Sequence, residues 1–218
     1  MKPCDIERLE RSVLSLVVQA MRDYWEEAVT IFREESDMPQ DIAEDITREA
    51  IASMGVSGTQ DRLYGKVDVK KAIYAFLPES VPVALMLDAK AEKPSATATI
   101  QMSQTSMKVR QERAGKLWDE QGKLETVIHR GSRKYRVVTI ISKFEYQETN
   151  GNRSLSRIVV CCIPSGELQD LYNPSAEDTI WLAGRDAPSL GEDFRVRISY
   201  QKLKAKADWR VQIVSEEI

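Results

Sequence analysis

Carboxylate and lysine residues carry the chemistry that this sequence offers. Asp88-Ala89-Lys90 follows the most apolar stretch of the chain, Val83 to Leu87, and Asp68 lies between Val67 and Val69. In a strand, alternate residues point to one face, so Asp88 and Lys90 share a face and Ala89 takes the other. A carboxylate and an ammonium group on one side of a core strand indicate either a functional site or a structural salt bridge.

A metal site is the functional reading of these residues. A hairpin-like pairing of the segments 62–70 and 81–90 would bring the carboxylates of Asp68 and Asp88 together. Two such groups repel each other unless a cation or a shared proton lies between them. Their oxygens suit Mg²⁺, which keeps its other positions for water and phosphate, while Lys90 would act on the attacking water or the phosphate. The residues predict metal-assisted phosphodiester hydrolysis, with a structural Asp88–Lys90 pair as the alternative.

Several other catalytic classes lack their residues. The one histidine, His129, lies in a segment, 124–130, that has the pattern of an exposed strand, so every histidine-based hydrolase or metal site would depend on it. No G-x-G-x-x-G motif or complete Walker loop occurs. Of three cysteines, Cys161 and Cys162 are adjacent, which fits neither a disulfide framework nor a zinc site. The cysteines are expected to be reduced and structural.

Length and charge set the wider frame. The chain has 218 residues and a net charge of −3, but residues 101–160 hold 12 basic and 6 acidic groups, a local charge of +6. A basic face of this kind can bind a polyanion although the whole chain is acidic. No apolar run approaches the roughly 20 residues that a bilayer needs, and no signal sequence precedes the first helix. We therefore expect a cytoplasmic protein without membrane contact.

The hydrophobic pattern predicts an α/β fold with a central mixed β-sheet. Helices are expected at 5–33, 39–54 and 107–121, with a polar loop at 94–106. The expected strands are 62–70, 81–90, 124–130, 135–146, 155–163, 193–200 and 209–214. The first helix carries more apolar residues than one stripe requires, such as Val17 with Val18, which predicts that it joins a subunit interface.

The same residues resemble a known family of nucleases. Asp68, and Asp88-Ala-Lys90 after Leu85-Met-Leu87, match the core of the PD-(D/E)XK nucleases. Within that superfamily the chain is similar to the SfiI family of type II restriction endonucleases over most of residues 40–214. The C-terminal blocks are the most specific part of this resemblance: Leu171-Tyr-Asn-Pro174, Ala183-Gly184, Ser189-Leu-Gly-Glu192, Arg195-Val-Arg197, Lys202-Leu-Lys204 and Trp209-Arg210.

The resemblance implies a restriction-endonuclease-like fold in one domain, residues 1–218, with a helical part at 1–55 and the catalytic sheet and DNA-binding loops at 60–218. It implies an enzyme that cuts double-stranded DNA at a long interrupted palindrome, leaves 3′ overhangs and works as a homotetramer on two sites. Asp68 and Asp88 carry over as Mg²⁺ ligands, and Lys90 carries over as the catalytic lysine. Glu44, on the second helix, is a further candidate for the metal site, with a solvated helix face as the alternative.

DNA contacts are expected in the loops beyond the catalytic strand. Lys93 can contact guanine or phosphate, Gln101 and Gln104 can contact adenine directly or through water, and Arg185 can contact a guanine edge. Each of these residues also fits an ordinary polar loop. A palindromic target requires two active sites related by a two-fold axis, so a homodimer is the smallest assembly expected.

Two other functions remain open at this point. A PD-(D/E)XK nuclease of DNA repair or recombination would share the metal site but recognise DNA structure instead of base sequence. A non-catalytic DNA-binding module would keep the fold and cut nothing. Discrete fragments from intact plasmid DNA would exclude the first, and any metal-dependent cutting would exclude the second.

Overall fold

A central mixed sheet organises the molecule. The computed structural model describes residues 1–55, 58–63, 70–75, 82–113, 115–182 and 195–216. Within these residues the main sheet has the order β1-β2-β3-β8-β9-β12, with β7 paired to β8. β3 and β8 run parallel, and the other pairs are antiparallel. The strands are β1 (Gly58–Leu63), β2 (Lys70–Ala75), β3 (Val83–Glu92), β7 (Val127–Arg130), β8 (Arg133–Thr149), β9 (Asn152–Ile163) and β12 (Val211–Val214). The expected mixed sheet is confirmed.

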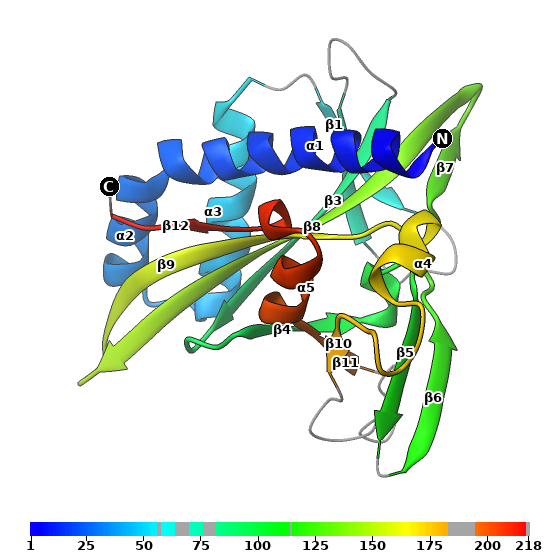
Figure 1. Ribbon diagram of the computed structural model, residues 1–218. Coiled ribbons are helices and arrows are strands. Elements are labelled where there is room, and N and C mark those ends of the chain that lie inside the picture. Colours follow the sequence, from blue (N-terminus) through cyan, green and yellow to red (C-terminus); the bar gives the residue numbers. More distant parts are fainter. Residues whose placement is uncertain (56–57, 64–69, 76–81, 114, 183–194, 217–218) are drawn as a thin grey trace.

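Helices cover one face of this sheet. They are α1 (Pro3–Asp23), α2 (Trp25–Glu34) and α3 (Pro39–Ser53), and Figure 1 shows α1 crossing the strands. The helix expected at 5–33 is therefore two helices, divided at Tyr24. Tyr24 leaves the helical conformation, with φ −102° and ψ 12°, and its hydroxyl donates a 2.6 Å hydrogen bond to Glu49 Oε2 of α3. The division lets α1 and α2 follow the twisted sheet while α3 packs beside them.

The apolar surplus of the first helix lies inside the chain's own core. Val17 and Val18 of α1 and Phe32 of α2 are buried, and the Phe32 ring stacks on Phe144 of β8 with centroids 5.7 Å apart. Strands β3, β8 and β9 supply the facing residues. The apolar residues extend beyond a single stripe because α1 and α2 together cover a broad sheet. The apolar residues that predicted a subunit interface on this helix are therefore explained by the chain's own core.

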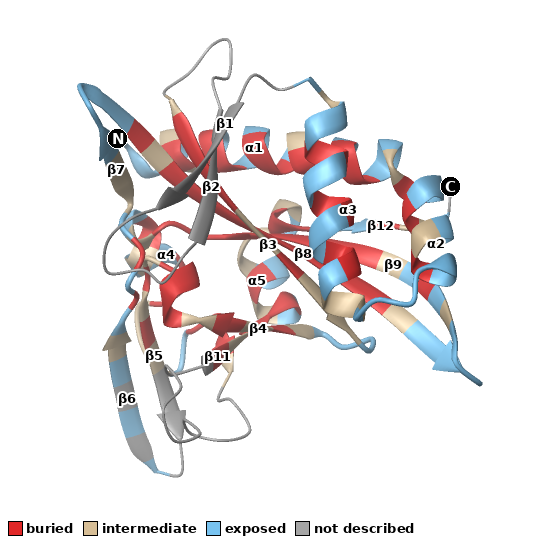
Figure 2. Ribbon diagram, turned by 180° about the vertical axis from the view of Figure 1, so that it is seen from behind, coloured by how far each residue is buried: buried red, intermediate tan, exposed pale blue. Residues whose placement is uncertain are grey.

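A smaller sheet and short helices cover much of the opposite face. The small sheet has the order β10-β11-β4, from Trp181–Leu182, Arg195–Ser199 and Thr97–Gln101. Together with α5 (Tyr200–Lys206), it packs on Ile141 of β8 and on the C-terminal half of β9. The remaining elements are η1 (Met102–Gln104), η2 (Gly166–Leu168), α4 (Gln169–Tyr172) and η3 (Asp208–Arg210). Figure 2 shows the buried residues concentrated where β3, β8 and β9 cross the centre.

The helix expected at 107–121 is wrong. This segment forms the hairpin β5 (Lys108–Arg113) and β6 (Lys116–Gln121). Gly115 has a φ of +71°, a left-handed turn conformation that interrupts any helix. Lys108 and Arg110 lie on the same side of β5 and both pair with Asp119 across the hairpin, at 3.4 and 3.3 Å. Their spacing of two, with Val109 buried between them, is the strand period that the helical reading overlooked.

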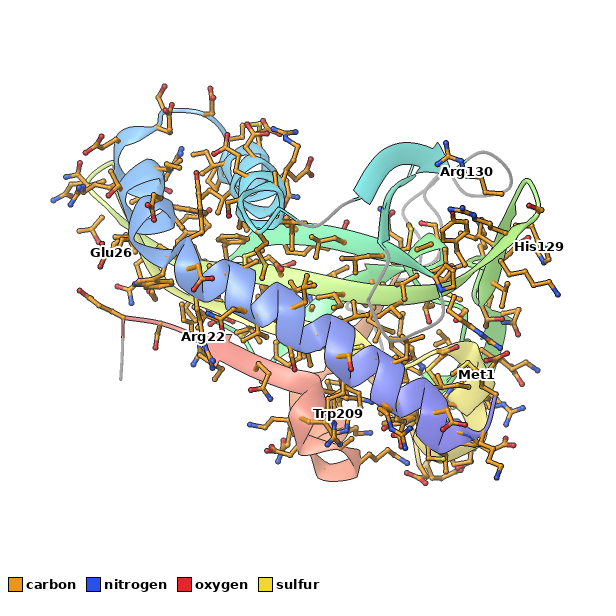
Figure 3. The ribbon with its side chains drawn as sticks, turned by 90° about the horizontal axis from the view of Figure 1, so that it is seen from above. Met1, Arg22, Glu26, His129, Arg130 and Trp209 are labelled. Carbon is orange, nitrogen blue, oxygen red and sulfur yellow. The ribbon has the colours of Figure 1, made fainter. Side chains whose placement is uncertain are left out.

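The helix expected at 39–54 and the strands expected at 81–90, 135–146 and 155–163 are confirmed with changed limits, whereas the segments 94–106 and 62–70 differ from the expectation. The loop expected at 94–106 contains β4 and η1. The segment expected as a strand at 62–70 covers the end of β1 and the start of β2, and its middle, 64–69, lies outside the described residues. His129 is exposed on the β7–β8 hairpin, as predicted, and Figure 3 shows it with Arg130 at the opposite end of the molecule from Glu26. Among the described residues, no helix is long and apolar enough to cross a membrane.

Candidate active site

The second half of β3 carries the charged residues of the site. Val83 to Met86 are buried, and from Leu87 onwards the residues are partly exposed, except for the buried Ala89. Asp88 and Lys90 share one face, and Lys90 Nζ lies 2.8 Å from Asp88 Oδ2. Their side chains are 23% and 19% exposed, respectively. The pair is thus held on a core strand and still open to solvent, which a reacting group requires.

A second lysine–carboxylate pair lies beside the first one. In the parallel register, Lys90 is opposite Lys143 of β8, and Glu92 is opposite Glu145. Lys143 Nζ lies 2.9 Å from Glu145 Oε1, and both side chains are fully buried. Arg157 of β9 contacts the other oxygen of Glu145 at 2.6 Å. The two pairs therefore share a sheet face but differ in access to solvent.

The buried pair fixes the turn that follows β3. Lys143 Nζ donates to Ser95 Oγ at 2.6 Å, and to the carbonyl oxygens of Ser95 and Thr97, both at 3.1 Å. The Ser95 N–H donates to Glu145 Oε1 at 3.1 Å. These bonds connect the chain between β3 and β4 to the centre of the sheet. Lys93, which lies in this connection, is exposed.

The ionised form of Glu145 is the one that these contacts favour. Burial alone would raise the pKa of this carboxyl group, but hydrogen bonds from Lys143, Ser95 and Arg157 outweigh burial and lower the pKa. Glu145 is therefore a carboxylate at neutral pH. Because each of its oxygens already has a charged partner, the group serves as an anchor and not as an acid or base.

A glutamine from α3 binds the backbone of the site. Gln40 Nε2 donates to the Ala89 carbonyl at 2.9 Å, and the Ala91 N–H donates to Gln40 Oε1 at 3.1 Å. The same Nε2 donates to Glu44 Oε1 at 2.9 Å. Sequence reasoning proposed Glu44 but missed Gln40. The only signal for Gln40 was its place after Pro39 in the first turn of the helix, which says nothing about the distant strand.

The predicted DNA contacts differ in access. Gln101 is half-buried at the end of β4, whereas Gln104 is only 2% exposed and accepts a 2.9 Å hydrogen bond from the Gln101 N–H. In this conformation Gln104 is closed to DNA, because its side chain caps a buried 3₁₀ turn. Arg185 lies outside the described residues, and so does Asp68.

One of the two proposed metal ligands, Asp88, lies among the described residues. Among the described residues, no group of three or more His, Cys, Asp or Glu side chains is placed to hold a metal. Asp88 provides a partly exposed carboxylate beside Lys90, and oxygen donors of this type suit Mg²⁺. Asp68, the other candidate ligand, precedes the first residue of β2 by two positions, and β2 pairs antiparallel with β3. Two carboxylate ligands leave the remaining positions of Mg²⁺ for water and phosphate.

Comparisons with known proteins give a consistent result. The family model described as type II restriction enzyme SfiI matches residues 25–214. The type II restriction enzyme SfiI of Streptomyces fimbriatus is 29% identical over 95% of this chain and 83% of its own length. The crystal structure of tetrameric SfiI bound to cognate DNA matches with a TM-score of 0.85 and 26% identity, over 100% of this chain and 87% of that one.

A second solved structure shares the fold at a larger sequence distance. The restriction endonuclease BglI bound to its DNA recognition sequence matches with a TM-score of 0.76 and 16% identity. The match covers 98% of this chain and 91% of that chain. The expected restriction-endonuclease-like fold is confirmed by both structures.

Proposed function

The chain belongs to the SfiI family of type II restriction enzymes, and from this membership and the geometry of β3 we propose that Asp88 and Lys90 form part of its catalytic centre. The reaction is hydrolysis of a phosphodiester bond in double-stranded DNA. Water attacks phosphorus, and the bond to the leaving oxygen of the deoxyribose breaks. The products are a phosphate end and a hydroxyl end.

Each residue of the centre has a distinct task. Asp88 and Asp68 are the residues that would hold Mg²⁺. When it is bound, this ion would act as a Lewis acid on the phosphate. Lys90 Nζ orients the attacking water or donates a hydrogen bond to a phosphate oxygen on which negative charge develops. Its contact with Asp88, at 2.8 Å, keeps the ammonium group at the position where both tasks are served.

The observation that carries the proposal is the solvent access of one ion pair on an otherwise filled sheet face. Next to Asp88 and Lys90, the face is closed by Ile141 and by the buried pair Lys143–Glu145. Partial access to solvent lowers the desolvation cost of the two charges, and at the end of a core strand it also leaves both groups within reach of a ligand. Access is what a phosphate of DNA requires.

The relatives support a proposal for the substrate and the assembly. The SfiI structure is a tetramer on cognate DNA. We assign to this chain an interrupted palindromic site, 3′ overhangs and a homotetramer built from two dimers. Lys93, Gln101 and Arg185 are the residues assigned to DNA contact. A dimer is the minimum for a palindrome, since each DNA strand needs its own catalytic centre.

End mapping tests the proposed activity. Purified protein is incubated with a long DNA of known sequence and Mg²⁺, and both ends of every fragment are sequenced. We expect discrete fragments whose ends share one symmetric sequence with protruding 3′ strands, and no cutting with EDTA. Cutting at branched or damaged DNA without a common sequence would instead indicate a repair nuclease. No cutting with any divalent metal would contradict the proposal.

Plasmids with one and with two target sites test the tetramer. A tetramer that holds two sites cuts the two-site plasmid faster, because the second site is tethered at a high effective concentration. Equal rates on both plasmids would remove the tetramer and leave the dimer. Light scattering that gives one chain per duplex would contradict the dimer also.

A further inference from the structure

One edge of β3 has two kinds of hydrogen-bond partner near Asp88 and Lys90: strand β2 and the side chain of Gln40. On the opposite edge, β8 pairs with β3 from Val83 to Glu92. On the first edge, the pairing with β2 that the structure describes covers Val83 to Met86. Asp88 and Lys90 thus lie on the part of β3 that follows this pairing. Backbone N–H and C=O groups at the edge of a strand need hydrogen-bond partners.

Gln40 supplies such partners. In a strand, the carbonyl of one residue and the N–H two residues later point to the same edge, and Ala89 and Ala91 are in this relation. The amide of Gln40 bonds both groups, at 2.9 and 3.1 Å, as the backbone of a neighbouring strand would. The residue between the two bonded groups is Lys90.

The orientation of this amide is fixed from within α3. The second hydrogen of Gln40 Nε2 goes to Glu44 Oε1 at 2.9 Å, one helical turn further along. A flipped amide would direct its oxygen at two acceptors and its NH₂ group at the N–H of Ala91. Every donor of Gln40 is satisfied in the observed orientation alone. Figure 2 shows α3 lying across β3, the strand that contains Ala89 and Ala91.

We propose that Gln40 is a positioning residue for DNA cleavage: its amide takes the place of a neighbouring strand at Ala89 and Ala91, and so sets the position of Lys90 between them. The inference rests on the proposed function, because it assumes that Lys90 acts in cleavage. Gln40 itself contacts no reacting atom. It acts through the backbone, where a small displacement of Lys90 away from the phosphate slows the chemical step.

Two readouts test this role in Gln40→Met, which keeps the length of the side chain and removes its hydrogen bonds. Single-turnover cleavage with saturating DNA and Mg²⁺ is expected to slow by about 10- to 100-fold, the loss that a small misplacement causes. The Kd for DNA in Ca²⁺ should stay within about twofold, because uniform binding is not altered. In the protein without DNA, exchange of the Ala91 amide hydrogen should become faster.

Gln19→Met is the matched control. Gln19 also makes a helical side-chain bond four residues along, from Nε2 to Asp23 Oδ1 at 2.7 Å, but on the exposed face of α1. It is expected to change neither readout. Gln40→Asn is the second variant, since it keeps the amide but is one methylene shorter, and both readouts should move as in Gln40→Met.

The outcomes separate the two claims. A wild-type protein that cuts no DNA contradicts the proposed function, and this result appears in the unmutated sample. A wild-type protein that cuts, together with a Gln40→Met variant that cuts equally fast, contradicts only the role of Gln40. Unchanged exchange of the Ala91 amide, or a loss confined to DNA affinity, would overturn the inference as well.

Discussion

Two lysine–carboxylate pairs lie on neighbouring parallel strands, with Lys90 opposite Lys143, and only the pair on β3 is open to solvent. In β3, Lys90 contacts Asp88 at 2.8 Å, and both side chains are partly exposed. In β8, Lys143 contacts Glu145 at 2.9 Å, and neither side chain has any exposed surface. The distances are nearly equal. What differs is the number of further partners and the access of water.

The difference shows what distinguishes a reactive pair from a structural one. Lys143 is surrounded by oxygens of Ser95, Thr97 and Glu145, so no donor remains for a ligand. For Lys90, Asp88 is the ion-pair partner in the part of the chain that the structure describes. Charge and spacing alone are therefore not evidence of catalysis. Partial exposure next to a buried, fully bonded pair is the more informative feature.

Removal of a proposed metal ligand should have the largest effect. Asp88→Asn, and separately Asp68→Asn, should abolish cleavage, because an amide lacks the charge that holds Mg²⁺. DNA binding in Ca²⁺ should persist or become tighter, since one negative charge near the phosphate is lost. Gel shifts and cleavage assays on the same samples measure both. Full cleavage by both variants would remove these residues from the site.

Disruption of the buried pair should mainly lower stability. Lys143→Met leaves Glu145 buried with one cationic partner fewer, and the free energy of unfolding should fall by about 3 to 5 kcal/mol, as for other broken buried pairs. Urea unfolding measures the change. If Lys143→Met is as stable as the wild type, the pair on β8 is not the structural anchor that the comparison requires.

The stabilising effect of Glu145 should depend on pH. Its pKa is lowered in the folded protein, so its contribution is present above the pKa of the unfolded chain, about 4.3, and is lost as the pH falls through the lower folded value. The stability difference between wild type and Glu145→Gln should thus be largest at pH 7 and shrink below about pH 4. Unfolding curves at several pH values test this. A difference that grows on acidification would have the wrong sign.

An exposed ion pair provides the smallest expected effect. Arg48 contacts Asp45 on the surface of α3, with both side chains about half exposed. Arg48→Ala should change the free energy of unfolding by no more than about 0.5 kcal/mol, because solvent screens such pairs. Thermal melts in low and high salt are sufficient. A loss comparable with that of Lys143→Met would show that burial does not explain the difference between the pairs.

Local patterns in the sequence predicted β3 correctly, together with the shared face of Asp88 and Lys90. The apolar run from Val83 to Leu87 marks a core strand, and the period of two places Asp88 and Lys90 on one face. Both features depend only on near neighbours. The hairpin at 108–121 was missed because its two strands are short and are interrupted at Gly115. The spacing of its charged residues therefore also fitted an exposed helix.

Contacts between distant segments were beyond the reach of these patterns. Gln40 and Ala89 are 49 positions apart, and Lys143 meets Ser95 across 48 positions. Gln104 has the type of a base-reading residue, but its burial follows from the packing of η1 and not from its neighbours in sequence. The resemblance supplied the family, while only the fold distinguishes Lys90 from Lys143.

The rate and the stability of Lys90→Ala, measured on one preparation, test the central claim most directly. If Lys90 acts on the water or the phosphate, single-turnover cleavage should fall by about 100- to 1,000-fold, the loss typical of one removed transition-state donor. The melting temperature should stay within about 2 °C of the wild type, because solvent reaches both side chains and hydrates Asp88 when its partner is removed. A large drop in melting temperature with a normal cleavage rate would contradict the account.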